Sequence, residues 1–428
     1  MKRLPLPIPM ALSAMRLFKL CPTLLALLLL TGCSLLNQMN QSHSPNTLRV
    51  LHYNIFELDS EKIEDLKLKD RPSLQLKSVK ELLAPFDFHL LSVNEIQYDQ
   101  PGVPYPSFQS DGENLAKLTH WLRPNKGWDF HFVPANTGAE AKKIAPQSYA
   151  TSEDEGARFY ADPNNYGLFP GQYSTGLSSR YPIKKKISIK SLPWKSFHPE
   201  INLNRFRNGQ REKLPKDLAL FDKAFMDTVI EVNHKEVHVI TLHTVPAYHF
   251  GNKQSPNYQR NLDQLRFLEW YLTGKTDIKT QQQYEGISPL KEGSYFIAMG
   301  DWNTDINQKN PGSAVLKRLA KSERLFPAHS KTWEAKGFLP GRMNMRLDYI
   351  YYSDNIQLMK AQVVIPDEKR VLLGCEKESL PVQEDEKREV VSYTNKAGKE
   401  CFVSLNQEFK VAKDASDHFP IWAEFKLR

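Results

Sequence analysis

The sequence has 428 residues, of which 40% are hydrophobic and 25% are charged, and its formal net charge is +8. This balance excludes a disordered, collagen-like or multi-span membrane chain, and four cysteines are too few for a disulfide scaffold. A chain of this length can bury a large core, either as one α/β domain with insertions or as two smaller domains.

The N-terminal segment predicts export. An apolar run from Leu20 to Leu30 follows basic residues, and it is too short to span a bilayer but has the length of a signal-peptide core. The run ends in Leu-Thr-Gly-Cys at residues 30–33, which resembles the lipobox of bacterial lipoproteins. The resemblance implies that residues 1–32 are a cleaved signal peptide and that Cys33 carries lipid. An uncleaved anchor and an ordinary signal peptide are the alternatives.

Residues 33–46 are polar beyond the cysteine and predict a flexible tether. Because Ser34 rather than Asp follows Cys33, the resemblance implies a lipid anchor in the cell envelope, in the outer membrane if the cell is Gram-negative. Cleavage would remove four basic residues and lower the net charge from +8 to +4. That charge helps to attract anionic substrates but is too small for a nucleic-acid-binding stripe.

Eight short apolar or alternating runs predict β-strands, and four segments with helical periodicity predict α-helices. Asn233-His234 predicts a hairpin, Pro72 a helix start, and Pro85 and Pro124 helix ends. Such a mixture predicts an α/β or α+β sandwich rather than a regular βαβ array. The predicted strands are Leu48–Asn54, His89–Asn94, Thr228–Val232, Val237–Leu242, Tyr295–Gly300, Leu347–Tyr352, Ala361–Ile365 and Ile421–Lys426, and the predicted helices are Ser73–Leu83, Glu113–Leu122, Tyr258–Leu272 and Ala314–Ala320.

Two polar stretches, at about residues 135–172 and 367–415, lack the periodicity of a core element and are predicted to be surface insertions. The second contains Cys375 and Cys401, the two cysteines that remain beside Cys33 after cleavage. An exported compartment permits disulfides, so we predict that this pair is bonded; two buried free thiols are the alternative.

Polar residues of only four types, Asn, Asp, Glu and His, stand at the ends of the apolar strands. If those ends lie together, carboxylates from distant parts of the chain meet in one pocket and repel one another. A hard divalent cation relieves this repulsion, and oxygen ligands suit Mg²⁺, Mn²⁺ or Ca²⁺ better than Zn²⁺. The residues concerned are Asn54, Glu95, His243, Asp301, Asn303, Asp348, Asp417 and His418.

Seven segments follow one another in order along the chain, and all but the third carry these residues: LRVLHYN (48–54), LLSVNE (90–95), STGLSSRYPI (174–183), VITLHT (239–244), FIAMGDWN (296–303), RLDYIYYS (346–353) and ASDHFPIW (415–422). With G-D-x-N and S-D-H-x-P separated by L-D-Y-I, the chain resembles the endonuclease/exonuclease/phosphatase superfamily, which includes DNase I. The stretch 166–183, with 243–248 and 260–272, resembles a branch of secreted bacterial members. The implied fold is a DNase I-like four-layer α/β/β/α sandwich, a single domain over 47–428 with surface insertions.

The resemblance also implies roles in the hydrolysis of a phosphate ester by an activated water. Glu95, helped by Asn54, would hold the metal against a phosphate oxygen, and Asp417 is a second candidate ligand. Asp301 would orient and deprotonate the water, while Asn303 would bind the phosphoryl group.

The histidines would complete the site. Asp348 would fix the tautomer of His418 and raise its pKa, so that the imidazolium binds phosphate, although some family mechanisms make this histidine the base. His243 would contact the phosphate or the leaving group, and His249 is a rival for that role. Tyr173 and Arg180 are the candidates for a further substrate contact, and Tyr173 is preferred.

The substrate class stays open at this stage. A nuclease or phosphodiesterase and a phosphatase for small organic phosphates rank close together, and a sphingomyelinase-like phospholipid hydrolase ranks third. A nuclease needs basic grooves, which Lys142-Lys143, residues 184–186 and Arg205, Arg207 and Arg211 could supply. A lipid hydrolase needs an exposed aromatic loop, for which 159–169 is the candidate. We expect a monomer. A non-catalytic binding lipoprotein is the alternative from another class.

Overall fold

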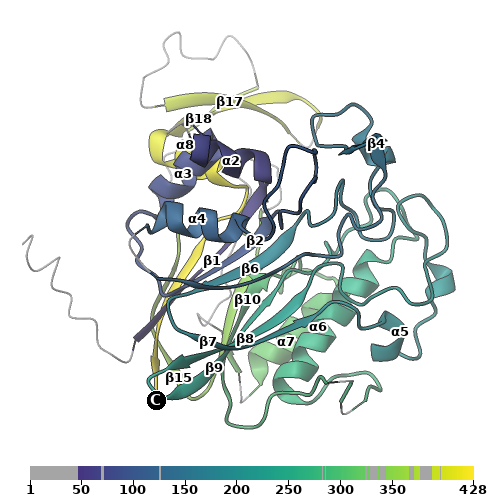
Figure 1. Cartoon of the computed structure of the whole chain (residues 1–428), viewed down its shortest axis with the longest axis vertical. Coiled ribbons are helices and arrows are strands. Elements are labelled where there is room, and N and C mark those ends of the chain that lie inside the picture. Colours follow the sequence, from purple (N-terminus) through teal and green to yellow (C-terminus); the bar gives the residue numbers. More distant parts are fainter. Residues whose placement is uncertain are drawn as a thin grey trace, which may run out of the picture. The chain divides into compact units, whose positions relative to one another are not determined.

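The computed structural model describes residues 47–68, 72–124, 127–281, 283–284, 286–322, 325–327, 335–336, 344–365, 371–375, 388–395 and 397–428. Residues 46–428 form one compact unit, which contains all of these ranges (Figure 1). The signal peptide, Cys33 and the tether that the sequence predicts at 1–46 lie outside the described residues. Among the helices that the structure describes, none is both long enough and apolar enough to cross a bilayer.

The first of two large sheets has six strands. β1 (Thr47–Leu58) and β2 (Leu90–Ile96) run parallel, and every other neighbouring pair in this sheet is antiparallel. In spatial order the strands are β15 (Ile356–Val363), β19 (Ile421–Leu427), β1 (Thr47–Leu58), β2 (Leu90–Ile96), β6 (Ser174–Ser179) and β3 (Asp129–Val133).

The second sheet also has six strands and a single parallel pair, β9 (Lys235–Leu242) with β10 (Tyr295–Asp301). Its spatial order is β11 (Leu325–Pro327), β14 (Asp348–Ser353), β10 (Tyr295–Asp301), β9 (Lys235–Leu242), β8 (Phe225–Val232) and β7 (Ile183–Ile189). β8 and β9 form a hairpin whose turn residues, Asn233 and His234, both have positive φ, which is the geometry of a tight two-residue turn.

Helices cover the outer face of each sheet, as Figure 1 shows. The first sheet packs against α3 (Leu74–Leu83), α4 (Asn114–Leu122) and α8 (Gln407–Ala415), and the second against α6 (Asn257–Thr273) and α7 (Pro311–Lys321). The remaining elements are α2 (Ser60–Leu68), α5 (Trp194–Phe197), the 3-10 helices Ala157–Phe159 and Leu203–Arg205, and the short strands β4 (Lys143–Ala145), β5 (Ser148–Tyr149), β12 (Ala335–Lys336) and β13 (Asn344–Met345).

Local chemistry sets where these helices begin and end. The Ser73 hydroxyl accepts a hydrogen bond from the backbone N–H of Leu76 at the start of α3, and the Asn310 side chain caps α7 in the same way ahead of Pro311. Gly274, with φ of 72°, ends α6 in the left-handed conformation that glycine adopts at little cost.

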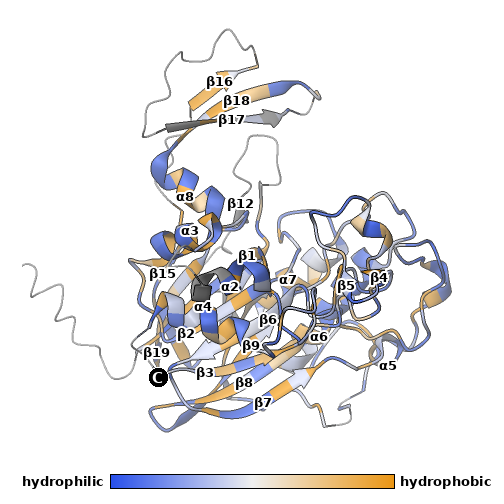
Figure 2. Cartoon of the chain, turned by 45° about the horizontal axis from the view of Figure 1, so that its top comes forward, coloured by the Kyte–Doolittle hydropathy of each residue, from blue (hydrophilic) through white to orange (hydrophobic). Residues whose placement is uncertain are grey.

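Three hydrophobic layers follow from this stacking. One lies between the two sheets, and the others lie between each sheet and its helices. Figure 2 shows hydrophobic residues along the strands and a hydrophobic stripe on α8. The described chain is therefore a four-layer α/β/β/α sandwich, as the sequence predicted.

The predicted strands and helices all occur, with bounds that shift by a few residues. The prediction of a surface insertion over 367–415 is wrong for its last part, because Val403, Leu405 and Phe409 are buried in the layer between α8 and the first sheet. Their apolar positions are too few and too interrupted by charge to stand out in the sequence. The stretch 135–172 is also more than a surface loop, since Ala150, Leu168 and Phe169 build a small core of their own.

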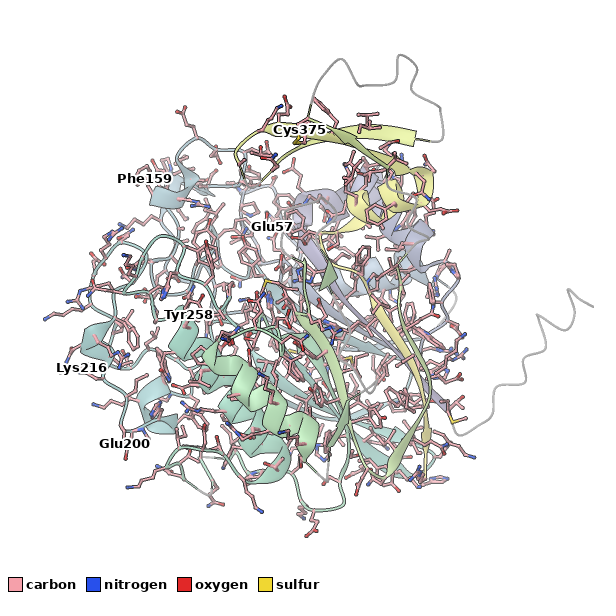
Figure 3. The ribbon with its side chains drawn as sticks, turned by 180° about the vertical axis from the view of Figure 1, so that it is seen from behind. Glu57, Phe159, Glu200, Lys216, Tyr258 and Cys375 are labelled. Carbon is pink, nitrogen blue, oxygen red and sulfur yellow. A yellow bond between two sulfur atoms is a disulfide. The ribbon has the colours of Figure 1, made fainter. Side chains whose placement is uncertain are left out.

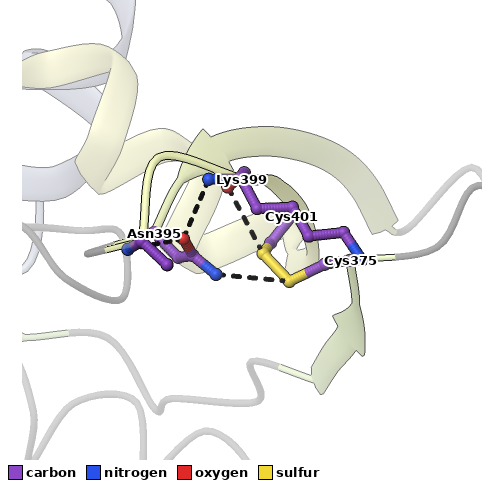
Figure 4. The surroundings of a disulfide bond; sticks show 5 residues. Cys375, Asn395, Lys399 and Cys401 are labelled. Carbon is purple, nitrogen blue, oxygen red and sulfur yellow. Dashed lines mark hydrogen bonds between the residues drawn. A yellow bond between two sulfur atoms is a disulfide. The ribbon is translucent and has the colours of Figure 1, made fainter.

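A three-stranded sheet, β16 (Val371–Gly374), β18 (Glu400–Asn406) and β17 (Arg388–Thr394), precedes α8. Within it Cys375 and Cys401 form a disulfide, and the Asn395 side chain hydrogen-bonds the Cys375 sulfur (Figure 4). The bond closes a loop over a sequence separation of 26 residues.

Replacing Cys375 and Cys401 together with alanine should lower the free energy of unfolding by about 3–4 kcal/mol, because the unfolded chain regains the entropy of the open loop. Denaturant unfolding measures this. Reductant should destabilise the wild-type protein by the same amount and leave the double variant unaffected; equal sensitivity of both proteins would contradict the prediction.

Candidate active site

The site lies where strand ends from both sheets meet. Parallel pairing brings the carboxyl ends of β1 and β2 to one edge of the first sheet, and the same holds for β9 and β10 in the second. β14 and β19 run antiparallel to their neighbours and so begin at that edge. These ends carry the predicted residues Asn54, Glu95, His243, Asp301, Asp348 and His418, and the structure brings all six together.

A bulge lifts Glu95 out of the strand ladder. The register between β2 and β6 shifts across this residue, whose φ is 63°. Its Oε1 accepts a hydrogen bond of 3.1 Å from the Asn54 amide Nδ2, and its Oε2 accepts one of 3.3 Å from the Glu57 backbone N–H. The same Nδ2 also donates to Asp301 Oδ2 at 3.0 Å. In this orientation Asn54 bridges two carboxylates as a donor. Its Oδ1 would face a metal ion only after the side-chain amide had rotated by about 180°, which exchanges Oδ1 and Nδ2.

Asp301 ends β10, and the glycine before it is required by a close approach. A Cβ on Gly300 would lie 1.7 Å from the Leu242 carbonyl oxygen. The Asp301 backbone N–H donates to the Asn94 side chain of the first sheet at 2.9 Å, which locks the two sheets together at the site. Asn303 donates its backbone N–H to Asp301 Oδ1 at 2.8 Å and its amide to the Thr244 carbonyl at 3.0 Å.

His243 follows β9 and is buried. Its Nε2 lies 3.5 Å from Asp301 Oδ2 and 3.8 Å from Glu95 Oε1. The rival His249 instead packs its ring against Tyr258, and His238 pairs with Asp227.

His418 is held by a carboxylate. Its Nδ1 donates to Asp348 Oδ2 at 2.7 Å, and its Nε2 lies 3.9 Å from Asp301 Oδ2. The other Asp348 oxygen accepts from His52 Nε2 at 3.1 Å. All three side chains of this His52–Asp348–His418 row are buried.

Burial shapes the charges of the site. Burial raises the pKa of Glu95 to about 7, and the nearby Asp417 carboxylate adds to the rise. Burial, with repulsion from Asp348, likewise raises the pKa of Asp301 to about 7. Without a cation, each of these two groups is therefore partly protonated near neutral pH.

The Asp348–His418 pair behaves in the opposite way. Burial disfavours charge on both groups, but their mutual attraction outweighs it. The pKa of Asp348 is held at about 2, and that of His418 lies well above its ordinary value. Burial, with repulsion from the Lys223 ammonium, lowers the pKa of His243 well below its ordinary value. The site thus combines a neutral and a positively charged imidazole.

The donor set fits a divalent cation. Ligand atoms of Glu95, His243 and Asp301 lie within 4.8 Å of one another, and those of Asp301, Asp348 and His418 do so as well. Glu95 and Asp301 are carboxylates whose charge burial disfavours, so a cation would restore their ionised forms. Chemically, the arrangement can bind an anionic substrate beside a cation and take a proton from water.

The remaining predicted residues lie at the margin. Asp417 has a half-exposed side chain, and its Oδ1 is 3.8 Å from His418 Nε2. Tyr173, with φ of 62°, donates its hydroxyl to Glu57 Oε1 at 2.6 Å. Both Tyr173 and Glu57 line a cavity of about 370 Å³ beside Glu95. Figure 3 marks Glu57 among the side chains that gather near this edge of the sheets.

Three residues of this region were not predicted as functional. They are His52, Asn94 and Glu57. His52 stands two residues before the predicted Asn54 on β1, and this spacing, which puts both side chains on one face of the strand, was the signal that could have found it. Asn94 contacts the Asp301 backbone from the other sheet. Glu57 contacts Tyr173 because the backbone at Phe56 and Glu57 is left-handed at two consecutive residues. Neither contact has a signature in the sequence.

Known proteins resemble this chain in sequence and in fold. A family model described as the Endonuclease/Exonuclease/phosphatase family matches residues 51–418. No curated protein matches the chain.

Solved structures also resemble it. An endonuclease/exonuclease/phosphatase from Beutenbergia cavernae is 14% identical with a TM-score of 0.46, over 89% of this chain and 72% of that one. A Bacteroides thetaiotaomicron mannosyl-6-phosphatase is 12% identical with a TM-score of 0.41, over 88% of this chain and 99% of that one. D. rerio TDP2 complexed with a single-strand DNA product is also 12% identical with a TM-score of 0.41, over 89% of this chain and 99% of that one.

The raised pKa values predict how the metal-free protein responds to pH. Glu95 and Asp301 bind protons more tightly in the folded protein than in the unfolded chain, so the free energy of unfolding should fall as the pH rises from about 4 to about 7. In EDTA, Glu95→Gln should remove its share of this loss, up to about 3 kcal/mol at pH 8. Thermal unfolding between pH 5 and 8 measures the difference from wild type.

The exposed Glu153 of the same cavity provides the matched control, and Glu153→Gln should follow the wild-type curve. Addition of Mg²⁺ should stabilise wild type more at pH 8 than at pH 5 and should not stabilise Glu95→Gln. A Glu95→Gln curve parallel to wild type would refute the buried-charge account.

Proposed function

Because the chain belongs to the endonuclease/exonuclease/phosphatase family, whose members hydrolyse phosphate esters, we propose that it is a divalent-metal-dependent enzyme that cleaves small organic phosphate esters. The supporting observation is the convergence of Glu95, Asp301, His243 and His418 from four distant segments at one edge of the sandwich. Mg²⁺ is the proposed ion, with Mn²⁺ and Ca²⁺ as alternatives, because the fixed oxygen donors are carboxylates.

Glu95 would hold the ion, with Asn54 and Asp417 at its margin. The ion supplies positive charge that offsets the charge developing on the phosphoryl and leaving-group oxygens. Asp301 would accept a proton from the attacking water at Oδ2, the oxygen that faces His243 and His418.

The charged His418 would donate from Nε2 to the phosphoryl group, since Nδ1 is committed to Asp348. The neutral His243 would donate or accept one hydrogen bond without adding charge. Asn303, with φ of 47°, is held beside Asp301 by its own backbone N–H, which places its amide near the same reacting group.

Charge on the cavity wall favours a small ester over nucleic acid. Four carboxylates and one lysine are among the residues that line the cavity beside Glu95, a poor match for a chain of phosphates. The carboxylates are Glu57, Asp59, Glu61 and Glu153, apart from Glu95 itself, and the lysine is Lys62.

The basic residues of two of the segments that could serve a nuclease lie away from the site or bind their own loop. Register in the second sheet puts Ile189 of β7 opposite Phe225, which pairs with Leu242 next to His243. Lys184–Lys186 therefore lie further along β7, away from the site. Arg207 donates to nearby backbone carbonyls of its own loop.

The aromatic loop supports lipid cleavage poorly. Phe169 is buried in the small core of 135–172, and Tyr160 packs against it, so Phe159 and Tyr166 are the exposed aromatic residues of that loop. Figure 3 shows Phe159 at the periphery. A surface lipoprotein that releases phosphate or alcohols from soluble esters agrees better with these features.

Asp301→Asn should lower kcat by about a hundredfold to ten-thousandfold with little effect on the fold, because the variant keeps the shape and loses the base. Release of p-nitrophenol from p-nitrophenyl phosphate and its bis ester, with Mg²⁺ or EDTA, measures this. Asp227→Asn is the control, because Asp227 is also a buried aspartate of the second sheet with a histidine partner.

An unchanged rate for Asp301→Asn would disprove the mechanism. Faster cleavage of plasmid DNA than of either small ester would make the protein a nuclease, and cleavage of sphingomyelin vesicles alone would make it a lipid hydrolase. If no ester is cleaved with any divalent ion, the result favours the alternative of a non-catalytic binding lipoprotein.

For localisation we propose a lipid anchor at Cys33 in the cell envelope. Cys33→Ser should abolish incorporation of labelled fatty acid and leave the signal segment uncleaved, as seen by mass. Cys21→Ser is the matched control, since this cysteine lies within the segment that would be removed. Continued lipid incorporation in Cys33→Ser would refute the anchor.

A further inference from the structure

Asp348 is the only charge between two buried histidines in the His52–Asp348–His418 row that the structure describes. Oδ2 accepts from His418 Nδ1 at 2.7 Å, and Oδ1 accepts from His52 Nε2 at 3.1 Å. The relative exposure of His52 is 0% and that of Asp348 is 1%. Neither carboxylate oxygen can therefore exchange its histidine for bulk water.

His52 is itself fixed from behind. Its Nδ1 lies 3.1 Å from the Ser92 hydroxyl, and His52 and Ser92 are directly paired across β1 and β2. A carboxylate only accepts hydrogen bonds, so His52 Nε2 carries the proton on the Asp348 side. The ring thus spans from the first sheet to the first residue of β14 in the second sheet.

A buried carboxylate with one oxygen unpaired is costly, and it turns toward any donor within reach. Turning Asp348 about its side-chain bond would move Oδ2 away from His418 Nδ1. The His418 ring would then no longer be held in the orientation that places its Nε2 3.9 Å from Asp301 Oδ2. Ring direction matters because a phosphate contact tolerates little error in position.

We propose that His52 is a positioning residue, which fixes the Asp348 carboxylate from the side opposite His418 and so aims the His418 ring at the substrate phosphate. This proposal rests on the phosphoesterase function proposed above. His52 touches no substrate in this scheme and acts through Asp348 alone.

Two amides of different length separate this role from simple core packing. In His52→Gln the side-chain amide reaches about as far as Nε2, so a donor to Asp348 is kept. In His52→Asn the amide reaches about as far as Nδ1, so the Ser92 contact is kept and the Asp348 contact is lost. His52→Leu removes both contacts and retains the volume.

With p-nitrophenyl phosphate and Mg²⁺, His52→Leu and His52→Asn should lower kcat about tenfold to hundredfold with KM unchanged, and His52→Gln should stay within about threefold of wild type. His131→Leu is the matched control, because His131 also bridges the sheets from a buried position, through Thr228 and Ser188, outside the site. It should keep wild-type kcat.

A readout independent of activity is the low-field proton NMR signal of His418 Nδ1–H on the full chain, assigned by its loss in His418→Gln. The signal should shift or disappear in His52→Leu and persist in His52→Gln and His131→Leu. Unchanged kcat in His52→Leu, equal losses in Gln and Asn variants, or an unmoved signal would overturn the proposal. If the wild-type protein cleaves no ester, the proposed function fails, and the NMR signal alone decides the role of His52.

Discussion

Burial of mutually repelling carboxylates between two sheets is the constraint on which this structure depends. A buried carboxylate is tolerated only when donors surround it. For the carboxylates of the second sheet these donors come largely from the first: Asn54 donates to Asp301, and His52 donates to Asp348. Asn94 adds a bond to the Asp301 backbone. The sandwich is therefore tied together at the point where its chemistry lies.

Backbone strain is concentrated at the same edge. Glu95, Asn303, Tyr173 and the pair Phe56-Glu57 have positive φ without being glycine, each at a cost of about 1–3 kcal/mol. The pairings of β1 with β2 and of β2 with β6 keep their register in the interior and shift at these ends. The bulges turn side chains toward the shared site, where a regular strand would have kept them in the ladder. This is a recurrent use of bulges.

Chemistry and selectivity come from different parts of the chain. The strands of the two sheets supply the acids and histidines, whereas the wall of the adjacent cavity comes mainly from connecting segments. The 135–172 segment has a small core of its own, and the chain returns from it through Tyr173 to β6. Variation in such a segment can change the ester that is accepted while the strand ends remain as they are.

The sequence by itself predicted the strands, the main helices and six polar residues that the structure brings together at one edge, because alternating apolar runs and the polar residues that end them are local signals. It could not show that α8 belongs to the core, since Phe409 is buried in a cluster whose other members come from distant segments, among them α3 and the first sheet. Of the side chains that contact Asp348 and Asp301, only the pairing of Asp348 with His418 was predicted, and it came from the family resemblance. His52 and Asn94 act across the gap between the sheets, and tertiary packing alone decides which side chains face each other there.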